Sequence, residues 1–304
     1  MRKREHSSKK RIRKNRGDRV FRAVCVTIVA LLVFIVLLPL MNIIASSFSA
    51  SSAVNSGKVL LWPVDFTLDN YRAILKYKSV WIGYRNTIFY TVVGTMINLV
   101  LTMFCAYPLS QKRFAGRRPV NMILFFTMIF SGGMIPNYIL MRDLGLMNTV
   151  WAVLLPGAVS VYNVMITRNY IESTIPTELE ESSRIDGCSP AGYFIHFIMP
   201  LSKTIIAVIA MYYAVAHWNS YFNAFMYLTD RELYPLQLFL RTILLESKFD
   251  SSIIDDPETA RALQGLAQTL KYVVIVVSTL PLMCIYPFVQ KYFVKGVMIG
   301  SVKG

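Results

Sequence analysis

Charged residues are missing from six long stretches of this 304-residue chain. The charge-free stretches are 23–57, 86–111, 119–141, 144–167, 204–229 and 272–290. Each can hold the ~20 apolar residues with which a helix crosses ~30 Å of hydrocarbon. Hydrophobic residues make up 55% of the chain, more than the ~45–50% that is typical of soluble domains. The composition therefore excludes an ordinary soluble globular protein.

The charge-free stretches predict the number and positions of membrane spans. Backbone N–H and C=O groups find no water inside a bilayer, so each stretch must form a helix that bonds these groups internally. We predict an all-α, polytopic membrane domain over 21–304, with six transmembrane helices near 21–47, 86–110, 119–141, 149–168, 204–224 and 271–291. The apolar run 233–240 is too short to span, and we expect it to cover a surface or to re-enter the membrane.

Residues and motifs that carry enzyme chemistry are also scarce. The four cysteines and three histidines are scattered, so neither a disulfide framework, a metal site nor a catalytic triad is indicated. Residues 187–191, Gly-Cys-Ser-Pro-Ala, only partly match a nucleophile elbow, because the last glycine and a preceding strand are missing. The chain has no Gly-x-x-x-x-Gly-Lys-Ser/Thr phosphate loop. We therefore predict that it is not an enzyme and binds no ATP or other cofactor itself.

Basic residues are unevenly placed, and their placement predicts the orientation. Residues 1–22 hold eleven Lys and Arg against two acidic residues, and loop 112–118 holds four more. The positive-inside rule assigns both segments, and with six spans also the C-terminus, to the cytoplasm of a plasma-membrane protein. Loops 49–84 and 225–270 then lie outside. We expect the basic arm, 1–20, to lie against anionic lipid; nucleic-acid binding is the weaker interpretation of its charge.

The first apolar stretch is predicted to be a retained span rather than a cleaved signal peptide. Its basic start and small-residue end resemble a signal sequence. However, the apolar part, 23–44, is longer than the ~7–15 residues of a signal-peptide core. Its removal would also leave five spans and place the C-terminus outside.

A polar segment between the fourth and fifth spans, 172–202, is the most informative part of the sequence. Thr177 as N-cap with Glu180 three positions later predicts a capping box at the start of a helix. Gly187 is placed to end that helix in a left-handed turn. Ser189 followed by Pro190 predicts a second N-cap, opening a helix that runs to about 198 before Pro200 breaks it. Two short helices joined by a tight turn suit a rigid knob inserted into a partner's groove. The alternative is a solvated helix face, with the aromatic residues merely lying at the bilayer interface.

This segment resembles the signature loop of inner-membrane permeases of ATP-binding-cassette importers. That signature reads Glu-Ala-Ala, three residues, Gly, and a spacer ending in Ile-x-Leu-Pro. Glu181, Gly187 and Pro200 occupy the matching positions with the same spacing. Two serines replace the alanines, and Phe197 and Met199 replace the isoleucine and leucine. These changes keep small residues small and apolar residues apolar.

Other motifs resemble the carbohydrate-importing branch of those permeases, over nearly all of the chain after the basic arm. They are Trp62-Pro63, Asn70-Tyr71, Arg85-Asn86-Thr87, His217-Trp218-Asn219-Ser220-Tyr221-Phe222, Tyr234-Pro235-Leu236-Gln237 and the tail 295–304. The resemblance is to the subfamily that imports oligosaccharides and aldouronates in Gram-positive bacteria. It implies the six-helix fold of type I importer permeases. It also implies four kinds of partner: a second, homologous permease forming a heterodimer, two cytoplasmic ATPase subunits that bind ATP and Mg, an extracellular solute-binding lipoprotein, and a carbohydrate substrate.

The resemblance also assigns a role to segment 172–202, which we call the coupling loop. In the family, this loop sits in a cleft of the ATPase and converts closure of the nucleotide sites into rocking of the spans. Glu181 would then make a polar contact with the ATPase, and Gly187 would permit the turn. The candidate coupling residues are Glu181, Ser182, Ser183, Asp186, Gly187, Ser189, Tyr193, Phe194, Phe197 and Pro200. Tyr193, Phe194 and Phe197 are the candidate apolar contacts.

Polar and aromatic residues within the spans are candidates for a sugar passage. Sugars are held by hydrogen bonds to amides and hydroxyls and by contact with aromatic faces, which this set can provide: Asn98, Asn163, Tyr212, Tyr213, His217, Trp218 and Asn219. The alternative is that they form ordinary interhelical hydrogen bonds worth ~0.6 kcal/mol each.

The rival hypothesis is a secondary transporter that works without an ATPase subunit. Such carriers usually place carboxylates or broken-helix ion sites within the membrane. No Asp, Glu, Lys or Arg lies at the centre of a predicted span. The sequence therefore favours the ATP-driven permease.

Overall fold

The structure is a computed structural model that describes residues 16–246, 269–284, 286 and 287. Those residues are mostly helical and contain no β-strand beyond one isolated bridge between Ser49 and Phe66. The helices are α1 (Arg16–Ser47), α2 (Ser51–Asn55), α3 (Asp69–Lys76), α4 (Lys78–Ser110), α5 (Arg117–Ile129), α6 (Met134–Asp143), α7 (Trp151–Leu154), α8 (Val161–Thr174), α9 (Thr177–Ile185), α10 (Pro190–Tyr193), α11 (Met199–Leu201), α12 (Lys203–Trp218), α13 (Phe222–Tyr227), α14 (Leu236–Glu246) and a last helix, Thr269–Cys284. A π-helical turn, Phe194–Ile198, joins α10 to α11, and a 3₁₀ turn, Arg231–Leu233, precedes α14.

Two helices are long and apolar enough to cross a membrane unaided. They are α1 and α4, with 32 and 33 residues. Helix α1 contains the predicted span 21–47. Helix α4 contains the predicted span 86–110 but begins eight residues earlier, inside the loop predicted at 49–84.

Two other predicted spans are interrupted, and the prediction of continuous helices is wrong there. Span 119–141 divides into α5 and α6, which are bent by 112°. Gly133 lies at this break with φ of +87°, a conformation that ends a right-handed helix. Span 149–168 divides into α7 and α8 at Pro156 and Gly157, whose φ is +80°. The described helices supply up to four spans by length and composition if two bent pairs each count as one span: α5 with α6, and Pro190–Leu201 with Lys203–Trp218.

The remaining spans differ from prediction at their ends. Helix α12 stops at Trp218 rather than continuing to 224, and a separate short helix, α13, follows. The predicted span 271–291 corresponds to the helix at 269–284, and residues 285 and 288–291 lie outside the described residues. Loop 225–270 is described only to residue 246. Within it, α14 packs along α4 with Leu236, Leu238 and Leu240 buried, so the run 233–240 covers α4.

Helix α4 is the centre of the bundle, with α8 and α12 packed along it. Its first half is fixed by sequence motifs that meet in space. Asn86 donates to the carbonyls of Glu232 (2.6 Å) and Tyr234 (3.0 Å), and Thr87 accepts from the backbone N–H of Leu236 at 2.8 Å. Side chains of one motif thus satisfy backbone groups of another motif about 150 positions away.

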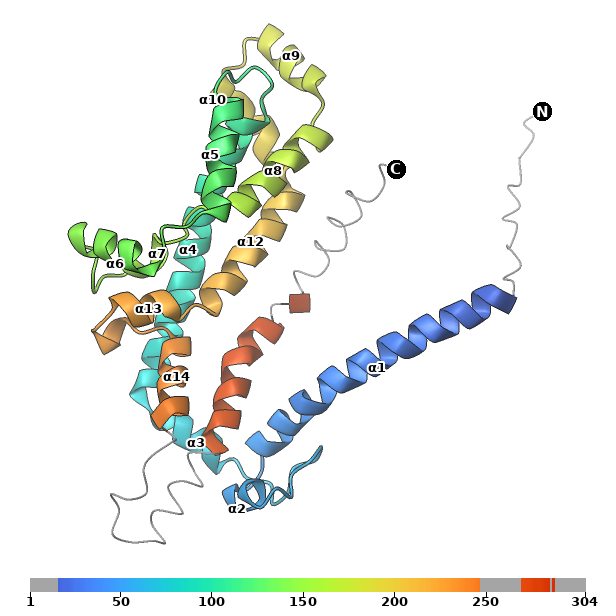
Figure 1. Cartoon of the computed structure of the whole chain (residues 1–304), viewed down its shortest axis with the longest axis vertical. Coiled ribbons are helices and arrows are strands. Elements are labelled where there is room, and N and C mark those ends of the chain that lie inside the picture. The colour runs from blue at the N-terminus through green and yellow to red at the C-terminus, as the bar shows by residue number, and fades with distance from the viewer. Residues whose placement is uncertain (1–15, 247–268, 285, 288–304) are drawn as a thin grey trace.

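The two ends of the molecule carry different elements (Figure 1). Helices α9 and α10, with the loop that precedes α5, lie at one end of α4. Helices α2 and α3 lie at the other end. Helix α1 slants away from the bundle, and most of its apolar side chains are exposed. The coupling loop and helices α2 and α3, which belong to the predicted outer loop 49–84, are therefore on opposite ends of one long bundle.

Candidate functional site

The first helix of the coupling loop, α9, begins one residue earlier than the sequence predicts. Pro176, in extended conformation (φ −64°, ψ 142°), is the N-cap of α9, and Thr177 is the first helical residue without a capping hydrogen bond. The predicted capping box is therefore wrong. Because Glu180 moves one position deeper into the helix, its carboxylate pairs with Arg184 at 3.1 Å instead of turning back to the N-cap. Glu178 and Glu180 still lie in the first turn, where the helix dipole favours negative charge.

The turn after α9 confirms the role predicted for Gly187. Its φ is +79°, in the left-handed region that side chains with a Cβ disfavour. The N–H of Cys188 donates to the carbonyl of Ser183 (2.9 Å), and the N–H of Gly187 donates to that of Arg184 (3.0 Å). This pair of bonds is a Schellman motif, which satisfies the last carbonyls of the helix. The turn is therefore rigid.

The second helix starts as predicted but does not stop at Pro200. The Ser189 side chain accepts from the N–H of Gly192 at 3.1 Å, and Pro190 occupies the first helical position, which confirms the second N-cap. The chain then widens into the π-helical turn Phe194–Ile198 and continues through Pro200 to Leu201. A proline ring clashes with the carbonyl four residues before it in an α-helix, and a π turn relieves that clash. The sharp bend, 78°, comes instead at Ser202, before α12.

Aromatic residues fasten the coupling loop to α4. Tyr193 is 3% exposed and Ile198 is 1% exposed, packed with Met103 of α4. The Phe194 ring lies 5.5 Å, centroid to centroid, from that of Phe104, and the Tyr193 ring lies 5.4 Å from that of Phe197. Burial, and secondarily the Glu180 carboxylate, raises the pKa of Tyr193 above 10.0, so the phenol stays uncharged in this core at neutral pH.

This packing changes what the aromatic candidates can do. Tyr193, predicted to be an apolar partner contact, is buried in its own chain and cannot offer a contact surface. Phe194 and Phe197 are half-buried in the same cluster. These rings instead pack the coupling loop against α4.

The exposed face of α9 holds the residues that a partner could touch. Glu181 is 63% exposed, and Ser182, Asp186, Gly187, Ser189 and Pro200 are also exposed. Ser183 is buried and donates to the carbonyl of Glu180. Ile185 is 86% exposed at the tip of α9 and was not among the predicted contacts. An isoleucine within the polar sequence Ser-Ser-Arg-Ile-Asp-Gly was the signal that could have indicated it.

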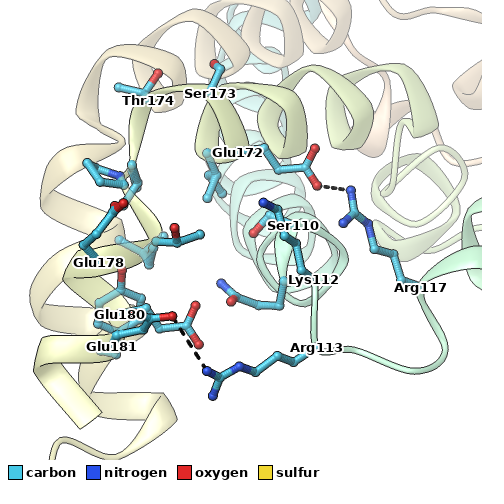
Figure 2. A pocket seen from close by; sticks show the side chains of 17 residues that line it. Ser110, Lys112, Arg113, Arg117, Glu172, Ser173, Thr174, Glu178, Glu180 and Glu181 are labelled. Atoms are coloured by element: carbon cyan, nitrogen blue, oxygen red, sulfur yellow. Dashed lines mark hydrogen bonds and ion pairs between the residues drawn. The ribbon is translucent and has the colours of Figure 1, made fainter. Parts of the chain in front are cut away.

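Charged residues of the loop before α5 face the coupling loop across a cavity of about 640 Å³. Figure 2 shows Arg117 pointing to Glu172 and Arg113 pointing to Glu181. Glu172 also accepts from Arg168 at 3.2 Å. The Arg113–Glu181 pair is open and long, at 4.0 Å. Sequence reasoning missed the two pairs that join this loop to the coupling loop, Arg117–Glu172 and Arg113–Glu181, because their members lie about 55 to 70 positions apart.

A second cavity, of about 280 Å³, brings together five of the seven candidate passage residues. It lies between α4, the 155–160 loop and α12, and is lined by Asn98, Asn163, Tyr212, Tyr213 and His217. Ser160, Ser220 and Asn223 complete its polar wall. Trp218 and Asn219 do not line it: the buried Trp218 indole donates to the carbonyl of Ser278 (3.0 Å), and the Asn219 amide donates to that of Val215 (2.9 Å).

Hydrogen bonds between helices hold this cavity in shape. Asn98 donates to the carbonyl of Gly157 (3.2 Å), and its side-chain oxygen lies 2.9 Å from Nε2 of His217. The Tyr213 hydroxyl bonds to that of Thr102 (2.7 Å) and accepts from the N–H of Ser160 (3.2 Å). The polar groups are thus fixed by the protein on one side and open to the cavity on the other.

Comparison with known proteins decides the family. Residues 77–299 match the family described as binding-protein-dependent transport system inner membrane component. This chain belongs to that family. It is the membrane permease component of an ATP-binding-cassette importer, and ATP hydrolysis is carried out by separate subunits. A secondary transporter that works without an ATPase is not favoured.

The relatives extend over almost the whole permease. It is 39% identical to the polygalacturonan/rhamnogalacturonan transport system permease protein YtcP of Bacillus subtilis (strain 168), over 94% of this chain and 99% of that protein. It is 41% identical to protein LplC of the same organism, over 89% and 90% of the two chains. A solved bacterial transporter that imports the acidic polysaccharide alginate has a chain that superposes with a TM-score of 0.81 at 35% identity, covering 93% of this chain and 99% of that one.

Proposed function

We propose that this permease carries uronate-containing oligosaccharides across the cell membrane, driven by an ATPase that binds the coupling loop. Two relatives are named for the transport of polygalacturonan/rhamnogalacturonan and of the acidic polysaccharide alginate, and each of these polymers contains uronate units. We call the cavity lined by Asn98, Tyr213 and His217 the passage cavity. The observation that carries the proposal is that the coupling loop and this cavity are both attached to one helix, α4.

The coupling step follows from that attachment. Glu181 and Ile185 on the exposed face of α9 contact the ATPase. Tyr193 and the aromatic rings beside it pass the displacement to Met103 of α4. Asn98 and Thr102 lie within about 8 Å of Met103 along the helix, at 1.5 Å per residue. A movement of the loop therefore reaches the passage with little intervening flexible backbone.

The passage supplies matching chemistry for sugars. Its described polar lining consists of amides, hydroxyls and one imidazole, and none of these lining side chains is a carboxylate or a Lys or Arg. Such groups bond to sugar hydroxyls and to a uronate carboxylate without holding either as an ion pair. Weak, replaceable contacts suit a route that must release its substrate. Selection of one sugar then falls mainly to the binding protein.

The assembly and orientation complete the proposal. The chain pairs with a second, homologous permease, two cytoplasmic ATPase subunits, which bind ATP and Mg, and an extracellular binding lipoprotein. Six spans place both termini and the coupling loop in the cytoplasm. The opposite placement of α9 and α2 along the bundle supports this arrangement. A membrane-impermeant thiol reagent applied to intact cells should leave Cys188 unlabelled, and labelling there would reverse the topology.

Reconstitution tests the activity. The complete complex is reconstituted in proteoliposomes with its binding protein outside. It should take up a labelled oligogalacturonate only when ATP is enclosed in the lumen, on the side of the ATPase subunits. This chain alone should take up none. Uptake of neutral maltotriose but not of oligogalacturonate would overturn the substrate class and leave the permease role intact. Uptake by the chain alone would overturn the ATP-driven mechanism.

A further inference from the structure

A third cavity, of about 730 Å³, also lies against the loop before α5. The start of α5, the loop before it and α8 surround it. Four cationic side chains line it, from Lys112, Arg117, Arg118 and Arg168. Among the described residues that line it, none is acidic. It thus differs from the neighbouring cavity under the coupling loop, whose wall includes four glutamates.

The positive charge of this basic pocket is only partly neutralised. Glu172, whose side chain is 27% exposed, accepts from both Arg117 and Arg168. Lys112 and Arg118 are exposed and form no ion pair in the part of the chain that the structure describes. Glu172 therefore pairs with two of the four cations, and Lys112 and Arg118 remain available to an anionic ligand.

Asn121 lines the pocket beside the cations and carries no charge. Its Oδ1 is covered by the protein, so a ligand would meet the rest of this side chain and not that oxygen. A negative charge introduced at this position would face the same ligand as the four cations.

Apolar side chains continue from the pocket along α5. Met122 is 73% exposed, and Phe125, Phe126 and Ile129 are also exposed. Within α5 no residue is buried. A charged pocket at the end of an exposed apolar helix matches the polarity of a phospholipid, with its headgroup in the pocket and its acyl chains along the helix.

We propose that the basic pocket binds an anionic phospholipid of the inner leaflet, of the phosphatidylglycerol type, with acyl chains lying along α5. The phosphate pairs with Lys112 and Arg118, and the headgroup lies beside Asn121. Basic pockets between helices on the cytoplasmic side are typical sites for anionic headgroups. The inner-leaflet assignment rests on the orientation given under the proposed function. The ligand class does not depend on which sugar is carried.

Lipid retention by the purified complex tests this proposal. The complex is purified from membranes containing phosphatidylglycerol, and the lipid retained per complex is measured by native mass spectrometry. Lys112→Gln and Arg118→Gln should each lower the affinity for phosphatidylglycerol about fivefold, since one cation near an anionic surface contributes about that factor. Asn121→Asp, a nearly isosteric change, should lower it further by repelling the phosphate. Arg118→Lys should restore binding.

Lys203→Gln is the matched control. Lys203 follows the coupling loop, is exposed, and lines none of the three cavities. It removes the same charge and should leave retention unchanged. Equal retention in all variants, or an equal loss in Lys203→Gln, would overturn the lipid site. Displacement of the bound lipid by millimolar inorganic phosphate would also overturn it, because the pocket would then be a site for free anions.

The same preparations separate this proposal from the proposed function. ATPase subunits that co-purify normally while lipid retention is unaffected by the variants would reject the lipid site alone. Lipid retained as expected in a complex that fails to bind ATPase would reject the coupling role alone.

Discussion

The coupling loop and the cavity at Asn98 and His217, which is the proposed passage, present polar groups in opposite ways. In the coupling loop, neighbouring residues fix one another: Ser189 caps the helix that it begins, and Gly187 forms the turn that ends α9. In the passage, residues far apart do so, as with Asn98 and His217, which are 119 positions apart. The loop is a locally encoded shape with an exposed face. The cavity exists only when three elements pack together. The two regions should therefore fail differently under mutation.

The largest effect is expected where the two regions join. Tyr193→Ala removes a buried ring beneath the coupling loop and should destabilise the complex by about 3–5 kcal/mol. Thermal unfolding of the detergent-solubilised complex measures this. Ile185→Ala is the matched control, because that side chain is exposed; it should leave stability unchanged and weaken ATPase binding. Equal stability of the two variants would contradict the anchoring role of Tyr193.

Next in size is a change within the passage. A Cβ at Gly94 would lie 2.5 Å from the His217 ring, so Gly94→Val should displace that ring and destabilise the complex by about 1–3 kcal/mol. Gly132→Val is the control, since its nearest neighbour would be 3.8 Å away. Shortening the histidine in the Gly94→Val, His217→Ala double variant should recover part of the loss. Strict additivity of the two changes would argue against direct contact.

A smaller effect is expected at the turn of the coupling loop. Gly187→Val places a β-branched residue at φ of +79°, at a cost of about 1–2 kcal/mol, although no atom lies within 4 Å of the added Cβ. The complex should assemble but hydrolyse ATP without transport. Asn tolerates this conformation better than Val, so Gly187→Asn should retain most transport. Wild-type uptake by Gly187→Val would show that the turn is not needed for coupling.

The charged network allows a graded comparison. Glu172→Gln loosens a largely covered carboxylate from two arginines and should destabilise by about 1–2 kcal/mol. Glu181→Gln breaks an open pair that contributes less than about 1 kcal/mol. Thermal unfolding at low and high salt distinguishes them. The opposite ranking would mean that the exposed pair, not the covered one, holds the loop in place.

The smallest effect on stability is expected from Glu181→Lys. The side chain is exposed, so folding and membrane insertion should remain normal. Co-purification of the ATPase should nevertheless fall, because the charge offered to the partner is reversed. Unchanged co-purification would remove Glu181 from the contact.

Local chemistry explains which parts of the fold were predictable. The cap at Ser189 and Pro190 and the turn at Gly187 are formed by hydrogen bonds to residues three positions away. They could therefore be predicted from neighbouring residues. Thr177 was assigned wrongly, because Pro176 had the extended conformation that also caps a helix. Spans 119–141 and 149–168 were predicted as continuous because hydropathy ignores the positive φ angles of Gly133 and Gly157.

The inward direction of Tyr193 could not be predicted, since both a partner groove and the chain's own α4 bury an aromatic ring equally well. The same limit applies to the ion pairs of Glu172 and to the cavity at Asn98. Each depends on which helices lie side by side.

The sequence by itself determined that this is a helical membrane permease with a polar coupling loop. The length of the charge-free stretches, the helix caps and the signature spacing all depend on residues close together along the chain. Only the tertiary structure decided which side chains of the coupling loop are exposed, which polar residues share a cavity, and which two of the four cations around the basic pocket pair with Glu172. Those outcomes depend on packing between segments that are distant in the chain, where no local preference specifies the neighbour.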